Sequence, residues 1–187
     1  VNAGAYDLSE TTLPGYTAGS WSCTGGTQSG AKVTLALGES ATCTINNNDD
    51  TAHLTLVKTV TNDNGGTAQT TDFTLSAAGP TPISGAGGAG SDVNAGAYDL
   101  SETTLPGYTA GSCSCAGGTQ RGAKLALSLG QSATCTINNN DDTAHLTLVK
   151  TVTNDNGGTA VAEDFKLSAA GPTPISGDGG VESDVNA

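Results

Sequence analysis

One unit of 92 residues is written twice in this chain: residues 1–92 recur without a gap as residues 93–184, with 14 of the 92 positions changed. The unit then begins a third time with residues 185–187. A period of this length is too long for a solenoid repeat and is about the size of one small domain. The repeat therefore predicts a tandem array of domains, which is typical of fibres, stalks and adhesin shafts rather than of enzymes.

The charge balance excludes one large class of partners. The chain carries 18 acidic and 6 basic residues, for a formal net charge of −12. This balance argues against nucleic acid, because phosphates need a basic surface. No run of about 18 apolar residues is present, so we expect no membrane span in this segment. The sequence has no Met and no signal peptide, which predicts a piece of a longer or processed protein.

Two polar strings suggest where the domains begin. Asn-Asn-Asn-Asp-Asp occurs at residues 46–50 and again at 138–142, without an apolar anchor, as in a linker. Division there predicts the C-terminal part of one repeat at 1–50, a complete repeat at 51–142 and the N-terminal part of the next at 143–187. Because half a sandwich cannot close a core, we expect the two partial units to need neighbours that complete them. Either the sequence is a window on a longer chain of repeats, or subunits complete each other head to tail.

Runs rich in Thr and Val between Gly- and Asn-rich turns predict β-structure, and no stretch shows helical periodicity. Within the complete repeat we expect a hairpin turn at 62–66 and a Pro/Gly-rich loop up to Gly90. The expected strands cover residues 53–61, 72–78, 97–104, 108–115, 123–129 and 132–139. Six or seven short strands per unit predict an all-β fold of tandem immunoglobulin-like or prealbumin-like β-sandwich domains.

Four of the five cysteines obey the repeat. Cys23 and Cys43 lie in one copy and Cys115 and Cys135 in the other, 20 residues apart in each. Each pair falls on two successive predicted strands, so we predict one disulfide per unit, worth about 3 kcal/mol through loop closure. A zinc site is a poorer explanation, because no second Cys or His pair lies at ligand spacing. Disulfides in small β domains indicate an extracellular location.

The fifth cysteine, Cys113, stands where the other copy has Trp21, the only Trp of the chain. One interpretation is a buried free thiol that fills part of a Trp site. The other is an exposed thiol that pairs with a lateral neighbour. Replacing a buried Trp with Cys would leave a large cavity at a cost of about 3 kcal/mol, so the position is expected at a surface or contact. This argument favours an accessible thiol.

Three predicted strands each carry one polar residue on the face that should point into the core. They are Lys58 on the first strand, Glu102 on a middle strand and Asn139 on the last. A buried Lys or Glu without a partner is costly, so this placement needs an explanation. One explanation is that the residues reach water at strand ends, or that Lys58 and Glu102 form a simple ion pair.

The sequence around Glu102 offers another explanation. The segment YDLSET at 98–103, followed by LPGY at 105–108, resembles the E-box and Pro-Gly-Tyr turn of collagen-adhesin B-type domains. These domains are the SpaA-like, prealbumin-like pilin repeats of bacterial surface proteins. The resemblance covers the whole 92-residue unit and implies a prealbumin-like fold.

In that family a Lys on the first strand attacks an Asn side chain on the last, a Glu or Asp moves the protons, ammonia leaves and an isopeptide bond remains. By position, the resemblance implies Lys58 as nucleophile, Glu102 as proton shuttle and Asn139 as electrophile. The Asn string leaves Asn138 and Asn140 as alternatives to Asn139. Burial favours a neutral amine and a protonated carboxyl, as this chemistry requires.

The partial units repeat the same trio in two pieces. Lys150 lies in residues 143–187, whereas Glu10 and Asn47 lie in residues 1–50. If one subunit completes the next, Lys150 of one should lie beside Glu10 and Asn47 of the other, joined by strand addition. The main partner of the chain would then be the chain itself, in a head-to-tail homopolymer.

Acidic residues beside the expected linkers suggest calcium as a candidate ion. Asp49, Asp50, Asp141 and Asp142 offer oxygen ligands near domain ends. Their spacing does not match the EF-hand loop, and the Asn-Asp-Asn-Gly-Gly segment at 62–66 is also simply a good hairpin turn. We therefore expect no required cofactor, with calcium at these aspartates as the alternative.

These features together predict an extracellular, structural repeat protein of the cell surface. We expect a filament, stalk or sheath fibre whose domains are completed head to tail and cross-linked by disulfides and isopeptide bonds. The alternative is a large bacterial adhesin whose repeats form the shaft or bind a ligand; loops poor in aromatic residues and Arg argue against ligand binding. The two histidines have no Ser or Cys partner at triad spacing, so we expect no enzyme.

Overall fold

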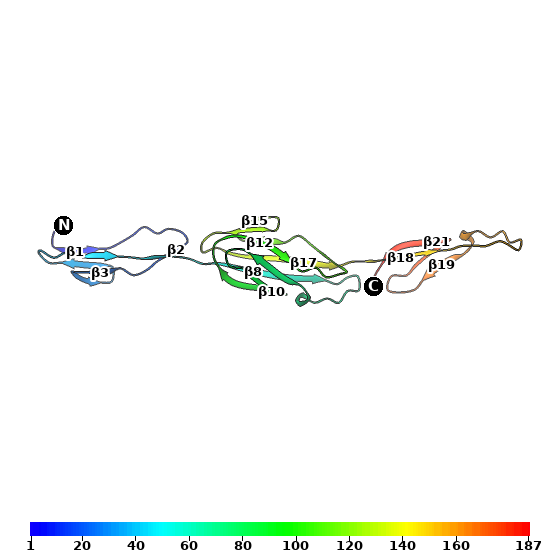
Figure 1. The fold of residues 1–187 in the computed structure, drawn as a ribbon, viewed down its shortest axis with the longest axis horizontal. Coiled ribbons are helices and arrows are strands. Elements are labelled where there is room, and N and C mark those ends of the chain that lie inside the picture. Colours follow the sequence, from blue (N-terminus) through cyan, green and yellow to red (C-terminus); the bar gives the residue numbers. More distant parts are fainter.

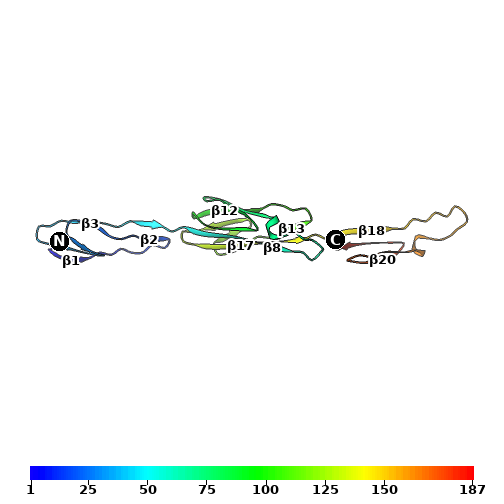
Figure 2. The same cartoon turned by 90° about the horizontal axis from the view of Figure 1, so that it is seen from below.

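Three bodies follow one another along an elongated chain in the computed structural model, which describes all residues from Val1 to Ala187 (Figure 1). The N-terminal body contains residues 1–50, the central body residues 51–142 and the C-terminal body residues 143–187. The view turned by 90° shows the same row, with the two outer bodies at opposite ends (Figure 2). The C-terminus turns back and ends beside the central body.

Nearly all regular structure is β. The strands of the N-terminal body are β1 (Gly4–Asp7), β2 (Tyr16–Ala18), β3 (Ser22–Thr24), β4 (Thr27–Ser29), β5 (Lys32–Leu35), β6 (Thr42–Thr44) and β7 (Asn47–Asp49). Those of the central body are β8 (Ala52–Thr61), β9 (Thr74–Ala78), β10 (Ile83–Ala86), β11 (Gly88–Val93), β12 (Gly96–Glu102), β13 (Tyr108–Ala110), β14 (Ser114–Ala116), β15 (Thr119–Arg121), β16 (Lys124–Leu127) and β17 (Ser132–Asp141). Those of the C-terminal body are β18 (Ala144–Val149), β19 (Lys166–Ala169), β20 (Ile175–Asp178) and β21 (Gly180–Val185).

The helices are two single 3-10 turns, η1 (Thr70–Asp72) and η2 (Ala162–Asp164). Each begins with a capping interaction in which the side chain of its last residue, Asp72 or Asp164, accepts a hydrogen bond from the backbone N–H three residues earlier. Neither helix has the length and apolar content that crossing a membrane would need.

The central body is a sandwich of two sheets. One sheet has the order β11-β8-β17-β13, with β14 also paired to β17, and the other has the order β10-β9-β12-β16-β15. The first and last strands, β8 and β17, run parallel, and Asn139 lies opposite Val60, two residues beyond Lys58. The parallel pairing therefore brings Lys58 and Asn139 together although 81 positions separate them in the sequence.

Period-two alternation builds the core of this sandwich. On β8 the inward face carries Ala52, Leu54, Leu56 and then Lys58, all of them buried. The apolar members of the core come from both sheets: Ala52, Leu54, Leu56, Leu75, Ala77, Val93, Tyr98, Leu125, Leu127, Ala133 and Cys135. Burying each large side chain contributes about 1.5–3 kcal/mol, so these contacts stabilise the sandwich in which Lys58 is buried.

The outer bodies each contain part of the same sandwich. The C-terminal body has the pairs β18-β21 and β19-β20, the sequence counterparts of β8-β11 and β9-β10. The N-terminal body has β1-β5-β4, β2-β7 and β3-β6, the counterparts of β12-β16-β15, β13-β17 and β14-β17. The C-terminal body lacks counterparts of β12 to β17, and the N-terminal body lacks counterparts of β8 to β11.

The all-β fold agrees with the prediction from sequence, but several details differ. The polar string at 138–142 is not a free linker, because strand β17 continues through Asp141 and buries both Asn139 and Asp141. The Pro/Gly-rich segment up to Gly90 is a loop only before Ile83, because β10 and β11 occupy the rest of it. These two strands pair with β9 and β8 in different sheets, and the chain passes from one sheet to the other at Gly87, whose φ of 75° suits glycine. The expected strand at 108–115 is broken into β13 and β14.

Candidate cross-linking site

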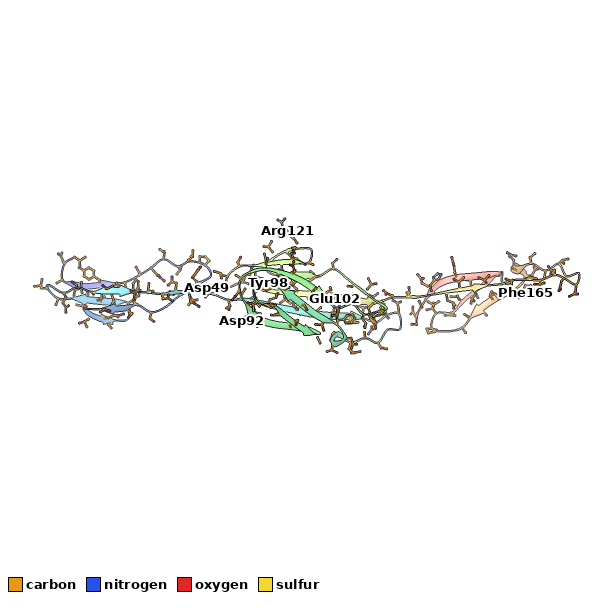
Figure 3. The ribbon with its side chains drawn as sticks, viewed as in Figure 1. Asp49, Asp92, Tyr98, Glu102, Arg121 and Phe165 are labelled. Atoms are coloured by element: carbon orange, nitrogen blue, oxygen red, sulfur yellow. A yellow bond between two sulfur atoms is a disulfide. The ribbon has the colours of Figure 1, made fainter.

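The amine of Lys58 lies in the interior of the central body, between a carboxyl and a carboxamide. Its Nζ is 2.8 Å from Glu102 Oε2 and 2.5 Å from Asn139 Oδ1. The Lys58 side chain is fully buried, and that of Glu102 is 8% exposed. Figure 3 shows Glu102 within the central body. The structure thus brings together the three residues that the sequence pattern singled out.

Both sheets contribute to this site. Lys58 comes from β8 and Asn139 from β17 of one sheet, whereas Glu102 comes from the end of β12 in the other. The ring of Phe73 closes the site, with its centroid 4.6 Å from Lys58 Nζ, and Phe73 is itself fully buried. The aromatic face attracts the amine and excludes water. The three polar groups therefore face one another in a low-dielectric setting.

One oxygen of Glu102 has no hydrogen-bond partner. Oε2 accepts from Lys58, but Oε1 is buried and unpaired. An unsatisfied buried acceptor is costly and rare in native proteins, and often indicates a chemical role. Oε2 is thus engaged with the Lys58 amine, and Oε1 is the oxygen of Glu102 that is free to exchange a proton with another group.

The other two asparagines of the string do not face the site. Asn138 is exposed, and its Oδ1 accepts hydrogen bonds from the hydroxyls of Thr59 and Thr61. Asn140 is also exposed. Alternation along β17 leaves only Asn139 on the inner face, because residues one position away point outward.

The second trio does not meet within one chain. Glu10 and Asn47 are exposed in the N-terminal body, whereas Lys150 belongs to the C-terminal body. The central body separates these two bodies (Figure 1). Lys150 is half-buried, and its Nζ lies 4.4 Å from the centroid of the Phe165 ring. The C-terminal body thus repeats the amine–aromatic arrangement of the central site without a carboxyl or a carboxamide beside it.

Both predicted disulfides are present. Cys23 is bonded to Cys43, and Cys115 to Cys135. In each case the two cysteines are directly opposite on antiparallel strands, β3 with β6 and β14 with β17. The regular spacing of 20 residues therefore reflects a repeated cross-strand pair.

Cys113 is free and half-buried. It lines a pocket of about 590 Å³ between the two sheets, together with apolar residues such as Leu75 and Leu100. Burial, and then the nearby carboxyl of Glu102, raise the pKa of the Cys113 thiol. The thiol is less accessible than the sequence argument favours, and its pairing with a lateral neighbour stays a prediction.

Asp141 holds the turn at 62–66 in place. Its carboxylate accepts backbone N–H bonds from Asp63, Asn64 and Gly66 at 2.9, 2.8 and 2.7 Å. Burial by itself would raise the pKa of Asp141, but these donors hold it below its ordinary value. The donors occupy the carboxylate oxygens that a cation would need. Calcium at the four linker aspartates stays a prediction.

The fold agrees with a family match along the chain. The family of prealbumin-like fold domains matches three times, over residues 1–45, 49–137 and 141–187. The gaps between the matches fall inside the two Asn strings. The chain belongs to this family, as the resemblance around Glu102 implied.

Solved structures similar to this chain include major pilins of Streptococcus pyogenes. The major pilin T3.2 is 13% identical with a TM-score of 0.37, over 75% of this chain and 68% of that chain. The major pilin T-13 is 13% identical with a TM-score of 0.34, over 76% and 68%. A mutant of the major pilin is 13% identical with a TM-score of 0.36, over 74% and 71%. No curated protein matches the chain.

Proposed function

We propose that this chain is the structural subunit of an extracellular, cell-surface filament, in which one chain completes the next head to tail. The observation that carries the proposal is the complementarity of the outer bodies: each has the strands that the other lacks. The tandem repeat and the family match support the same function. Isopeptide bonds would then fix each sandwich after it has closed.

The central body is the template for a completed junction. There β8 pairs with β11 on one side and with β17 on the other. In the C-terminal body β18 has its β11-like partner, β21, but its other edge is free. In the N-terminal body β6 and β7, the counterparts of β17, lack a β8-like neighbour. Strand addition between two chains would satisfy both free edges.

Aromatic side chains that are exposed in the outer bodies have more buried counterparts in the central body. Phe165 is 39% exposed and Tyr16 is 42% exposed. Their counterparts are Phe73, which is fully buried, and Tyr108, whose ring packs edge to face on Phe73 at 5.7 Å. Bringing Phe165 of one chain onto Tyr16 of the next would rebuild this pair, which favours association by burying apolar surface.

A carboxylate of the N-terminal body, at the end that joins the central body, has the same complementarity (Figure 3). Asp49 is exposed, whereas its counterpart Asp141 is buried against the turn at 62–66. The counterpart of that turn, residues 154–158, has the same sequence and lies in the C-terminal body. Head-to-tail contact would give Asp49 the backbone N–H donors that Asp141 already has, and hydrogen bonds to a carboxylate are among the stronger ones.

The chemistry proposed for Lys58 is an amide exchange that needs no cofactor. The neutral amine attacks Cγ of Asn139, the carboxyl of Glu102 accepts a proton from Nζ, and a proton is delivered to the departing amide nitrogen. A C–N bond to Lys58 forms, the C–N bond to the original nitrogen breaks, and ammonia leaves. In a completed junction Lys150 would react in the same way with Asn47, assisted by Glu10.

Contacts within the chain define how successive bodies are joined. Ala187 N donates to Asn64 O at 2.7 Å, and Asn186 Nδ2 donates to Asp63 O at 3.3 Å. The turn at 62–66 has the same sequence as residues 154–158, and the segment 185–187 has the same sequence as residues 93–95. At a junction between chains we therefore expect the turn at 154–158 of one chain to contact residues 93–95 of the next.

Assembly of the chain should be visible through its single Trp. The counterpart of Trp21, Cys113, lies between the two sheets beside Leu75, so in a completed junction Trp21 would pack against the equivalent Leu167 of the next chain. We expect Trp21 emission to shift to shorter wavelength as the protein concentration rises, while electron microscopy shows filaments lengthening. A chain that stays monomeric, with unchanged emission at every concentration, would overturn the proposed function.

Substituting one glycine should separate the inter-chain joint from general folding. In Gly157→Ala, the added methyl meets nothing within 4 Å in the isolated chain, whereas the same atom on its counterpart Gly65 would lie 2.2 Å from Ala187 O. Gly157→Ala should therefore raise the concentration needed for assembly, by about tenfold for a moderate clash. The control is Gly122→Ala, which also has positive φ and open space around it. Equal assembly of both variants would contradict the proposed joint.

A further inference from the structure

The second copy of the repeat contains three sulfur atoms in one place. The Sγ atoms of Cys113, Cys115 and Cys135 all lie within 4.8 Å of one another. Two of them form the disulfide and the third is a free thiol. In the first copy the third position is Trp21, so the Cys23–Cys43 bond has no thiol beside it.

The space around the third sulfur allows it to move. Cys113 and Cys135 both line the pocket of about 590 Å³ between the sheets, whereas Cys115 does not. The smaller side chain at position 113 leaves volume that an indole would occupy in the other copy. Cys113 thus shares this pocket with Cys135, and its sulfur has room to approach that of Cys135.

We infer that Cys113 is a second covalent partner of Cys135, so that the disulfide of this copy exchanges between Cys115–Cys135 and Cys113–Cys135. A direct Cys113–Cys115 bond is the poorer alternative, because only Ser114 separates these two residues and the ring would be very small. Cys135 is on the facing strand β17, where a bond to either cysteine still joins the same two segments.

The exchange balances without an added oxidant or reductant. The Cys113 thiol loses its proton, and its thiolate attacks Cys135 Sγ. The bond from Cys135 to Cys115 breaks, and Cys115 leaves as a thiolate that takes up a proton. One disulfide and one thiol are present before and after. Burial and Glu102 raise the pKa of Cys113, so the reactive thiolate is scarce and the exchange is slow.

Two matched serine variants of the full chain test this inference. Cys115→Ser leaves Cys113 as the only thiol that can bond Cys135. Cys23→Ser leaves Cys43 without a substitute partner, because Trp21 stands at the position of Cys113 in that copy. Each variant is equilibrated in a mixture of oxidised and reduced glutathione, which supplies the oxidant that a new disulfide needs. The unpaired cysteines are then alkylated under denaturing conditions and counted by intact mass.

We expect Cys115→Ser to have no alkylated cysteine, and Cys23→Ser to have two, one at Cys43 and one divided between Cys113 and Cys115. In the unmodified chain a single label should divide between Cys113 and Cys115 after long incubation, as located by fragment-ion mass spectrometry. Two labelled cysteines or glutathione adducts in Cys115→Ser, at Cys113 and Cys135, would overturn the inference. So would a label that stays wholly on Cys113 in the unmodified chain.

Discussion

Replacing Lys58 with alanine should remove a covalent bond from the central body and change its mass and stability together. The monomer without substitutions is expected to have a mass about 17 Da below the value calculated from its sequence, because forming one isopeptide bond releases one ammonia. Lys58→Ala cannot form that bond and should have the mass of its sequence. Intact-mass spectrometry of the denatured monomer fraction measures the difference directly.

The expected loss of stability is large because the bond closes most of the central body into a loop. Lys58 and Asn139 are 81 positions apart. The loop-closure expression used for disulfides gives about 4–5 kcal/mol for a cross-link of that span. For a domain of this size, such a loss lowers the thermal midpoint by on the order of 20 °C, measurable by calorimetry.

Lys124→Ala is the matched control for this prediction. Lys124 also lies on a strand of the central body and is paired with a carboxylate, Asp99, but both side chains are largely exposed. This surface pair should contribute little to stability, and its loss should leave the deficit of about 17 Da unchanged. If the chain without substitutions has the full mass calculated from its sequence, no isopeptide bond forms. Lys58 and Glu102 would then be a simple buried ion pair.

The sequence predicts the central trio for a definite physical reason. Strand alternation depends only on position, so a polar residue in phase with leucines must point inward wherever the strand lies. Lys58, Glu102 and Asn139 each follow this rule on a different strand. The repeat also predicted the two disulfide pairs, but their strands are not successive in the chain as expected. β4 and β5 lie between β3 and β6, and β15 and β16 lie between β14 and β17.

Features that depend on tertiary contacts were not predictable in this way. The string at 138–142 has the composition of a linker, yet β17 extends into it because β8 and β13 supply backbone partners on both sides. The burial of Asp141 depends on N–H donors from the distant turn at 62–66. The approach of Cys113 to the disulfide depends on how β14 pairs with β17. The exchange of Trp21 for Cys113 between the two copies does not reveal this pairing.

A charge on the inner face of β18, the strand of the C-terminal body with one unpaired edge, should abolish filament growth. Leu146 lies on β18, and its counterpart Leu54 is fully buried in the completed central sandwich. Leu146→Asp would place a carboxylate in the core of every junction, at a cost of several kcal/mol. A loss of this size raises the concentration needed for assembly by at least a hundredfold, so we expect sedimentation to show monomers where the unmodified chain forms filaments.

Thr151→Asp separates burial at the junction from the effect of added charge. Its counterpart Thr59 is exposed on the outer face of β8 and donates a hydrogen bond to Asn138 Oδ1. The new carboxylate should therefore remain in water and lose only one exposed hydrogen bond, so assembly should change far less than in Leu146→Asp. Both variants should keep the mass deficit of the central body, which serves as an internal check that the sandwich between residues 51 and 142 has folded. If Leu146→Asp assembles as readily as Thr151→Asp, the inner face of β18 is not buried in the filament. Strand addition at this edge would then be wrong, since a core position cannot accept an unpaired charge without weakening the contact.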